Sequence, residues 1–180
     1  VLDGESMRDS IYKMISDVVE NTVDTFIGDD QDPQEWDLSG LNETLLPIIP
    51  FEMITVERIG CKNKAELKHA LKQEGTKLYE AKEAEFPNPE MIRELERVFL
   101  LKVIDRKWMN HIDDMEQLRQ GIGLQAYGQR DPLVEYKMNG YEMFEAMTAS
   151  IQEDTVRLLM HVKIEEKAER EEVAQVTGTN

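Results

Sequence analysis

Hydrophobic residues recur at steps of three and four along the first part of the chain. The positions with this spacing are Met7, Ile11, Ile15, Val18, Val19, Val23 and Phe26. Such spacing is typical of an amphipathic helix that packs one face on a core. Asp3 or Ser6 is suited to cap its start and Gly28 to end it, so the pattern predicts a long helix over residues 1–28.

The next residues, 29–59, alternate breakers with short apolar runs. An acidic linker broken by Pro33 leads to a short helix that Ser39 heads and Pro47 ends. The leucines of this helix are Leu41, Leu45 and Leu46. Residues 48–59 are apolar without a helical period, and their β-branched run favours a short extended piece.

Two capping signals mark the helices that follow. Asn63 and Glu66 form a capping pair, and Asn88 followed by Pro89 is typical of an N-cap and the first residue of a helix. The face of the helix after Asn63 carries Leu67, Leu71, Leu78 and Ala81.

Two long helical arms complete the pattern. The stripe of the first arm contains Val98, Leu101, Ile104, Trp108, Ile112, Met115, Leu118 and Ile122. The stripe of the second contains Leu133, Tyr136, Gly140, Phe144, Met147, Ile151, Leu158 and Val162. Each arm has about 30 residues and so spans roughly 45 Å. Facing stripes joined by a short turn predict an antiparallel helical hairpin, and hence an all-α fold in which a small, mostly helical unit separates a long helix from the hairpin.

The arms carry more apolar surface than one seam can bury. The residues off the two stripes are Phe99, Leu100, Val103, Met138, Tyr141 and Met143. We expect the helix over 1–28 to be the third member of the bundle, with the excess directed toward parts of a longer protein. The ten methionines either fill gaps between helices or form an adaptable contact surface.

The turn between the arms is polar and rich in glycine. Gly121, Gly123 and Gly128 loosen it, and Asp131–Pro132 closes it. Tyr127 is hard to bury within its own hairpin, and its ring and hydroxyl suit contact with polypeptides of varied sequence. The alternative is a tyrosine that folds back on its own loop.

These segments, in this order, resemble the SecA family of preprotein translocase motors. The similarity is carried by residues 1–3, 36–41 and 91–133, and it is most specific between Trp108 and Tyr136.

The turn departs from the family pattern at three positions. Motors of this family commonly carry His, Arg and Ala where this chain has Gly123, Gln125 and Gly128. These departures predict a less basic and more flexible tip.

The resemblance implies four segments. Residues 1–28 end a long helix of the helical scaffold, 29–87 form the helical wing, 88–165 form the two-helix finger of the scaffold, and 166–180 form an acidic, largely disordered tail. It also implies that other parts of the parent protein bind ATP and magnesium, whereas this segment holds no cofactor. This segment would couple the ATPase domains to the finger and restrain ATP turnover when no substrate is engaged.

The resemblance assigns contact with the moving polypeptide to Tyr127, Leu124 and Gln129 at the finger tip. The implied partners are the nucleotide-binding domains of the same parent chain, a SecYEG-type channel and unfolded preprotein. The implied place is the cytoplasm, with peripheral association, through the channel, at the inner face of the bacterial cell membrane. Trp36 and Trp108 are predicted to be structural anchors, since an indole buries a large area and needs one hydrogen-bond partner.

The charge balance narrows the range of partners. The formal net charge of the 180 residues is −16, which repels the phosphates of nucleic acids and anionic lipids.

The single cysteine, Cys61, excludes an internal disulfide and fits a reducing compartment. Because the chain opens on Val1 and becomes helical at once, we expect a piece of a longer protein, without a signal peptide or a membrane span.

The sequence contains none of the common catalytic motifs. There is no phosphate-binding loop, dinucleotide fingerprint or Gly-x-Ser-x-Gly elbow, so this segment is not expected to be an enzyme by itself. His69, His111 and His161 lack the spacing of a zinc site. The alternative to a motor segment is a free-standing all-α adaptor that binds partner helices through its Met- and Leu-rich faces.

Overall fold

The computed structural model describes residues 4–125 and 131–165. Its elements are α1 (Gly4–Phe26), the 3₁₀ helix η1 (Pro33–Glu35), α2 (Leu38–Leu45), α3 (Val56–Ile59), α4 (Lys64–Ala84), α5 (Pro89–Gln125) and α6 (Pro132–His161). No strand occurs within the described ranges, and the predicted all-α class is confirmed. The predicted tail over 166–180 lies outside the described residues.

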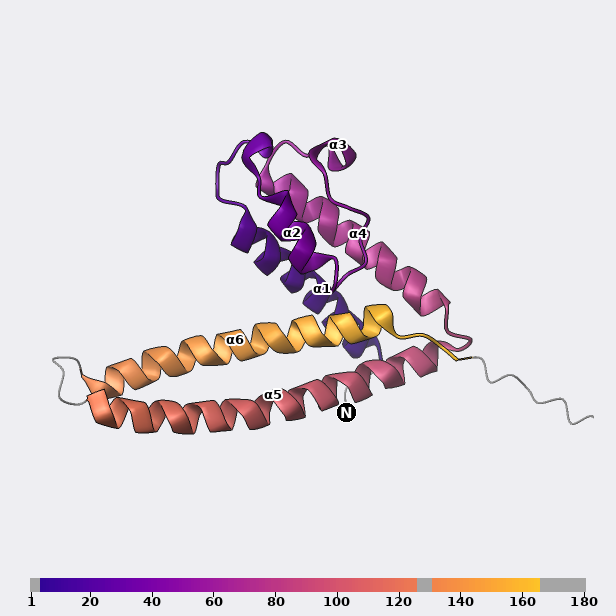
Figure 1. Ribbon diagram of the computed structural model, residues 1–180. Helices are drawn as coiled ribbons and strands as arrows, with labels where there is room; N and C mark the ends of the chain where they lie inside the picture. The colour runs from indigo at the N-terminus through magenta and orange to yellow at the C-terminus, as the bar shows by residue number, and fades with distance from the viewer. Residues whose placement is uncertain (1–3, 126–130, 166–180) are drawn as a thin grey trace, which may run out of the picture.

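The helices form two groups (Figure 1). α5 and α6 lie side by side as a long antiparallel hairpin, and α1, α2 and α4 form a bundle at one end of it. α5 has 37 residues and α6 has 30, or about 55 Å and 45 Å at 1.5 Å per residue. The first arm is longer than expected because the helix continues through Gly121 and Gly123, two residues that were predicted to lie in the turn.

α1 is the central element of the fold, as the apolar spacing predicted. It packs against α2, α4, α5 and α6. Six of its predicted core residues are at most 2 % exposed, namely Met7, Ile11, Ile15, Val18, Val19 and Val23. Burying a side chain of this size stabilises the fold by about 1.5–3 kcal/mol, so this helix fixes the position of both groups.

The segment between α1 and α4 differs from the prediction in two details. Asp37, and not Ser39, caps α2, because its side chain accepts a hydrogen bond from the backbone N–H of Gly40 at 2.9 Å. The expected extended piece over 48–59 is absent. The Asn42 side chain instead accepts from the N–H of Ile54 and donates to its carbonyl oxygen, which satisfies backbone groups that a strand would have paired.

α4 begins where the capping pair predicted. The Asn63 side chain accepts from the N–H of Glu66 at 2.9 Å, and the Glu66 carboxylate accepts from the N–H of Lys62 at 2.7 Å. One face of α4 is tied to α1 by ion pairs. Lys68 Nζ lies 2.7 Å from carboxylate oxygens of both Glu20 and Asp24.

That contact is part of a larger set, which we call the lysine ladder. Its members are Lys64, Lys68 and Lys72 of α4 with Glu20, Asp24 and Asp29 from α1 and the loop after it. Because each lysine meets at least one acidic group, the ladder neutralises charge along the contact between the two helices.

The predicted stripe of the first arm is wrong over much of its length. Its members Val98, Leu101, Ile104, Trp108 and Ile112 are 36–55 % exposed. Ile122 is the one stripe residue that is buried among the described side chains, and the other residues that α5 buries, Ile92, Glu96 and Val103, lie outside the stripe. α5 is apolar on more than one face, so periodicity alone does not choose the face that meets α6.

The second arm follows its predicted stripe in part. Tyr136, Met147 and Ile151 are half-buried, whereas Leu133 and Phe144 are 58 % and 46 % exposed. The predicted stripe of α6 therefore contains both half-buried residues and residues that are exposed to solvent.

One buried apolar cluster joins the bundle to the base of the hairpin. It contains residues of all three predicted segments, for example Val19 of α1, Leu71 of α4 and Leu159 of α6. The boundaries at residues 28 and 87 stay a prediction, since the cluster crosses both.

Candidate functional site

The hairpin is fixed at one end and projects at the other. Within α6 the buried residues all lie near the C-terminal end of the helix, namely Thr155, Val156, Leu159 and Met160. This end packs on α1, while the far part of the hairpin extends beyond the bundle (Figure 1). The candidate site is this projecting part and the tip that it carries.

The structure describes only part of the predicted tip. Leu124 is 81 % exposed at the end of α5. Asp131 caps α6 by accepting a hydrogen bond from the N–H of Leu133 at 3.0 Å, and Pro132 follows in the first turn, as expected for a residue that closes the turn.

The remaining tip residues have two outcomes. Gly121 and Gly123 lie inside α5, where a Cβ added to either would meet no atom within 4 Å. Tyr127, Gly128 and Gln129 lie outside the described residues, so their roles stay predictions. The two described helices therefore leave fewer residues between them than the glycine spacing indicated.

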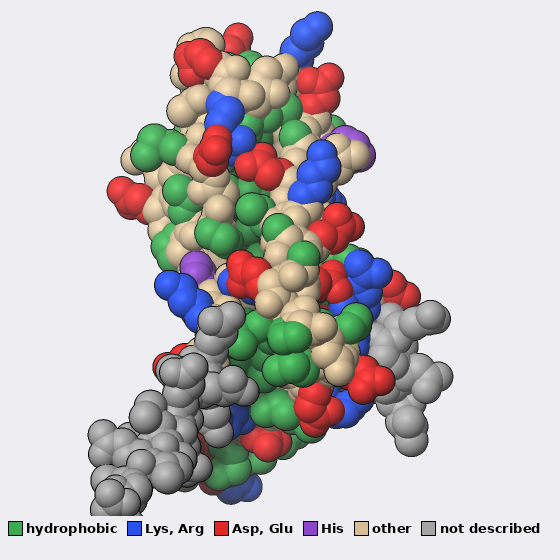
Figure 2. Space-filling view, turned by 90° about the vertical axis from the view of Figure 1, so that its right-hand side faces the viewer, with side chains coloured by type: hydrophobic (Ala, Val, Ile, Leu, Met, Phe, Trp, Pro, Cys, Tyr) green, Lys and Arg blue, Asp and Glu red, His purple; other side chains and the backbone are tan. Residues whose placement is uncertain are grey.

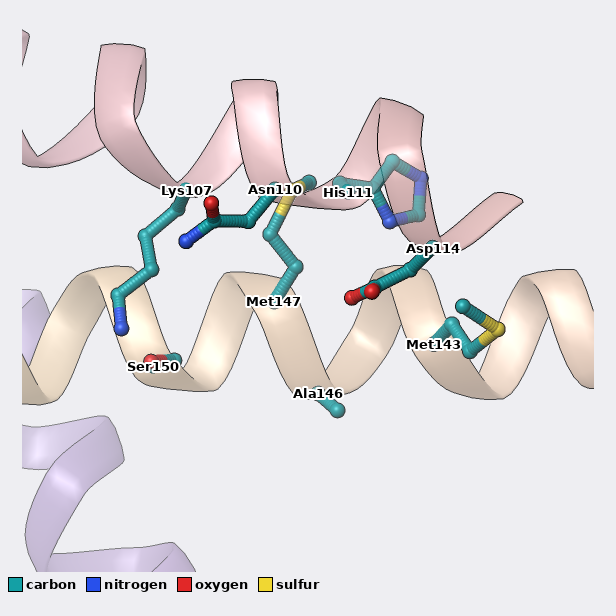
Figure 3. A pocket seen from close by; sticks show the side chains of 8 residues that line it. All are labelled: Lys107, Asn110, His111, Asp114, Met143, Ala146, Met147 and Ser150. Carbon is teal, nitrogen blue, oxygen red and sulfur yellow. The ribbon is translucent and has the colours of Figure 1, made fainter. Parts of the chain in front are cut away.

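The seam of the hairpin becomes polar near its middle. A groove of about 290 Å³ opens there. It is lined by Lys107, Asn110, His111 and Asp114 of α5 and by Met143, Ala146, Met147 and Ser150 of α6. Figure 3 shows Met147 reaching from α6 toward α5 beside Asn110. The arms are thus less tightly packed here than at the base.

An aromatic row crosses the seam beside this groove. The His111 ring lies 5.6 Å from the Trp108 ring and 6.0 Å from the Phe144 ring, centroid to centroid. Trp108 and Phe144 are 48 % and 46 % exposed. The exposed side chains Leu101 and Ile104 precede Trp108 along α5 and Ile112 follows it, and Tyr141 lies one turn from Phe144. We call these six exposed residues the apolar hairpin face.

The two predicted anchors differ in burial. Trp36 is 8 % exposed, and its indole Nε1–H donates to the carbonyl oxygen of Gln31 at 3.3 Å. Trp108 is half-exposed, so the described residues leave much of its indole uncovered. The anchoring roles of both residues stay predictions, and that of Trp108 now requires a surface that the described residues do not supply.

A partly buried carboxylate joins the two arms. Asp154 of α6 contacts Lys107 Nζ at 3.0 Å and Arg106 Nη2 at 3.2 Å on α5, and Arg157 Nη1 at 2.8 Å on its own helix. Burial opposes ionisation of Asp154, but the hydrogen bond from Lys107 and the charges of all three cations outweigh it and lower the pKa of the carboxyl group.

A second polar cluster lies at the base of the hairpin. Glu96 of α5 is fully buried, and it accepts hydrogen bonds from Arg93 of the same helix and from the Tyr79 hydroxyl of α4. Arg93 also donates to Glu83 of α4, and Glu83 accepts from Arg8 of α1 at 3.2 Å. We call Arg8, Tyr79, Glu83, Arg93 and Glu96 the base cluster.

Burial dominates the ionisation of this cluster. It raises the pKa of Glu96 even though Tyr79 and Arg93 hydrogen-bond to the carboxyl group. Burial, together with the neighbouring Glu96, also raises the pKa of the Tyr79 hydroxyl. One signal of this cluster is visible in the sequence. Glu96 stands four residues after Ile92 and three before Phe99, and is thus a charged residue on an apolar face.

Metal-binding clusters and membrane-spanning helices are both absent from the described ranges. No group of three or more His, Cys, Asp or Glu side chains there is placed to hold a metal ion. No helix there has an apolar stretch long enough to cross a membrane. The notable features are therefore contact surfaces and charge clusters.

Comparison with known proteins identifies relatives over the whole chain. The chain is 64 % identical over 188 aligned residues to the protein translocase subunit SecA of Lachnoclostridium phytofermentans, with 100 % of the chain and 21 % of the relative covered. It is 46 % identical over 180 residues to SecA of Finegoldia magna, with 99 % and 19 % covered. It is 45 % identical over 183 residues to SecA of Clostridium perfringens, with 100 % and 22 % covered.

The chain spans about one fifth of the length of these curated relatives. The family model of the SecA Wing and Scaffold domain matches residues 1–163, which include every described helix. The chain, with its projecting hairpin and the bundle at the base of that hairpin, therefore belongs to the SecA wing and scaffold family.

Proposed function

We propose that this chain is the part of an ATP-driven preprotein translocase motor that carries polypeptide contacts on its hairpin. The observation that supports this most directly is the hairpin itself, which has a buried base, an exposed apolar face and a projecting end. Its relatives are SecA translocase subunits. That relationship favours a motor segment over the free-standing adaptor.

The hairpin is suited to transmit motion from its base to its tip. The buried end of α6 and the central helix α1 hold the base, and Asp154 with Lys107 and Arg106 ties the arms together farther out. A change at the base therefore moves both arms together. In this proposal Tyr127, Leu124 and Gln129 contact the moving polypeptide, and the base conveys the state of the ATPase domains and restrains ATP turnover without substrate.

The proposal places the nucleotide elsewhere. ATP and magnesium would bind nucleotide-binding domains of the same parent chain, and this segment would hold no cofactor. The further partners would be unfolded preprotein and a SecYEG-type channel. The motor would act in the cytoplasm, peripherally associated with the inner face of the bacterial cell membrane.

The decisive test is transport by the full motor with a changed tip. Tyr127→Ala removes the ring and the hydroxyl, and Leu124→Ala removes an exposed side chain, so both should reduce preprotein transport. Tyr127→Phe should retain more transport than Tyr127→Ala if apolar contact dominates. Glu116→Gln, at an exposed position of α5, is the control. Normal transport by Tyr127→Ala would contradict the tip assignment.

The 180-residue chain alone tests the regulatory part. Added to a motor that lacks these residues, it should lower the basal ATPase rate. Calorimetric titration of the chain with Mg-ATP should give no saturable binding, because no phosphate-binding loop occurs in its sequence. An unchanged ATPase rate would argue against regulation, and saturable micromolar binding of Mg-ATP would argue against the placement of the nucleotide.

A further inference from the structure

The contact between α4 and the hairpin combines apolar packing on α6 with polar interactions toward α5. Among the described helices, α5 packs closely along α1 and α6, whereas α4 is not one of its close neighbours. Two interactions join α4 to α5, the ion pair of Glu83 with Arg93 and the hydrogen bond from Tyr79 to Glu96. A third joins α4 to the residues after α6, from Lys82 Nζ to the carbonyl oxygen of Val162 at 3.0 Å.

The base cluster divides into two neutral pairs along this contact. On one side Glu83 of α4 pairs with Arg8 of α1, and on the other Arg93 pairs with Glu96 within α5. Breaking the Glu83–Arg93 ion pair therefore leaves each arginine with a carboxylate of its own. Opening a contact that left a buried charge unpaired would cost far more.

The surroundings leave room for such opening. A hollow of about 540 Å³, lined by Lys82, Glu85, Pro87, Lys163 and Ile164, lies beside the linker between α4 and α5. The face of the molecule shown in Figure 2 displays acidic and basic side chains interspersed. One oxygen of Glu96, Oε2, is buried without a hydrogen-bond partner, so the closed arrangement does not satisfy this carboxylate fully.

We propose that the base cluster is a separable joint, at which α4 can part from the hairpin base while α1 keeps its contacts with both. The Glu83–Arg93 and Tyr79–Glu96 interactions hold the joint closed. When they break, the pairs Arg8–Glu83 and Arg93–Glu96 remain. This property belongs to the chain itself and does not depend on the motor function proposed above.

Distance measurements between spin labels on the full 180-residue chain test the joint. In a Cys61→Ser background, labels at Gln73→Cys in α4 and Asp105→Cys in α5 report on the joint. Labels at Gln73→Cys and Lys13→Cys in α1 form the reference pair. All three label positions are exposed. Glu83→Gln and Tyr79→Phe should each shift the α4–α5 distances to longer values and broaden them, while the α1–α4 distances stay as in the wild type.

Two further variants separate a joint from a general loss of structure. Glu94→Gln removes an exposed ion pair within α5 and should change neither distance. Arg93→Met leaves Glu96 without a cation and should lower the melting temperature more than Glu83→Gln, which leaves the Arg93–Glu96 pair intact. The proposal is overturned if Glu83→Gln leaves the α4–α5 distances unchanged, if it lengthens both label pairs alike, or if it destabilises as much as Arg93→Met.

Discussion

Gly75 of α4 and Ile15 of α1 are in contact so close that a Cβ on Gly75 would lie 3.0 Å from Cγ2 of Ile15. Ile15 is 1 % exposed and branched at Cβ, so it has little freedom to move aside. Gly75→Ala should destabilise the chain by about 1–2 kcal/mol, because the crowding outweighs the better helix propensity of alanine. Urea unfolding followed by circular dichroism measures the change.

Gly140→Ala is the matched control. A Cβ there would also lie 3.0 Å from its nearest neighbour, but that atom is the terminal methyl carbon of Met115. Because methionine is flexible and this contact lies in the half-buried seam, the gain in helix propensity of up to about 1 kcal/mol should prevail. Equal destabilisation by both substitutions would show that the distance alone, and not the stiffness of the neighbour, decides the cost.

The lysine ladder should make stability fall in acid. Hydrogen bonds from Lys68 and Lys72 lower the pKa of Glu20 below its ordinary 4.5, and hydrogen bonds from Lys64 and Lys68 lower that of Asp24 below 3.8. A carboxyl group with a lowered folded-state pKa adds stability above its ordinary pKa, and this stability is lost as the pH falls through the lowered value.

The corresponding measurement is the free energy of unfolding between pH 6 and pH 2. Glu20→Gln combined with Asp24→Asn should make the decline below about pH 4.5 shallower. Lys68→Gln should also make this decline of the free energy of unfolding shallower, because it removes a cation that pairs with both carboxylates. Added salt should make the decline shallower in the wild type, since these groups are partly exposed. A decline of wild-type steepness in the double variant would exclude the ladder as its source.

The two tryptophans should differ in their contribution to stability. Trp36→Ala should cost about 3–5 kcal/mol, as for a buried aromatic residue. Trp108→Ala should cost under about 1 kcal/mol, because half of its side chain already faces solvent. Chemical denaturation measures both, and acrylamide should quench the fluorescence of Trp108 more strongly than that of Trp36. Similar quenching would indicate that Trp108 is covered in solution.

Replacing only the arginine of the Arg93–Glu96 pair in α5 should cost more stability than replacing both residues. Arg93→Met leaves the fully buried Glu96 without its cation and should destabilise the chain by about 3 kcal/mol or more. Adding Glu96→Leu removes the stranded charge but leaves the buried Tyr79 hydroxyl without its acceptor, so it should restore part of the loss. If the double variant is no more stable than Arg93→Met, the arginine acts through Glu83 and not through Glu96.

Local signals in the sequence predicted the elements well. Asn63 and Asn88 each cap a helix as expected, because a cap depends on residues within one turn. The buried face of α1 was also predictable, since its apolar residues occupy one side only.

The choice between faces was not predictable for α5. Its apolar residues surround the helix, and the face that packs is decided by α1 and α6, whose contacting residues are not part of the local pattern of α5. The same holds for Glu96, whose partner Tyr79 lies on another helix. Its position on an apolar face was visible, but its partner was not.

The length of α5 beyond Val103, a buried residue in the first half of the helix, sets a scale for any movement there. From Val103 to Gln125 the helix extends roughly 33 Å at 1.5 Å per residue. A rotation of only about 10° at the base would displace the far end by about 6 Å, close to the length of two residues of extended polypeptide. Side-chain rearrangement at a joint permits a small angular change of this kind. The length of the hairpin converts that change into a displacement of its far end that is similar to the length of two residues of an unfolded chain.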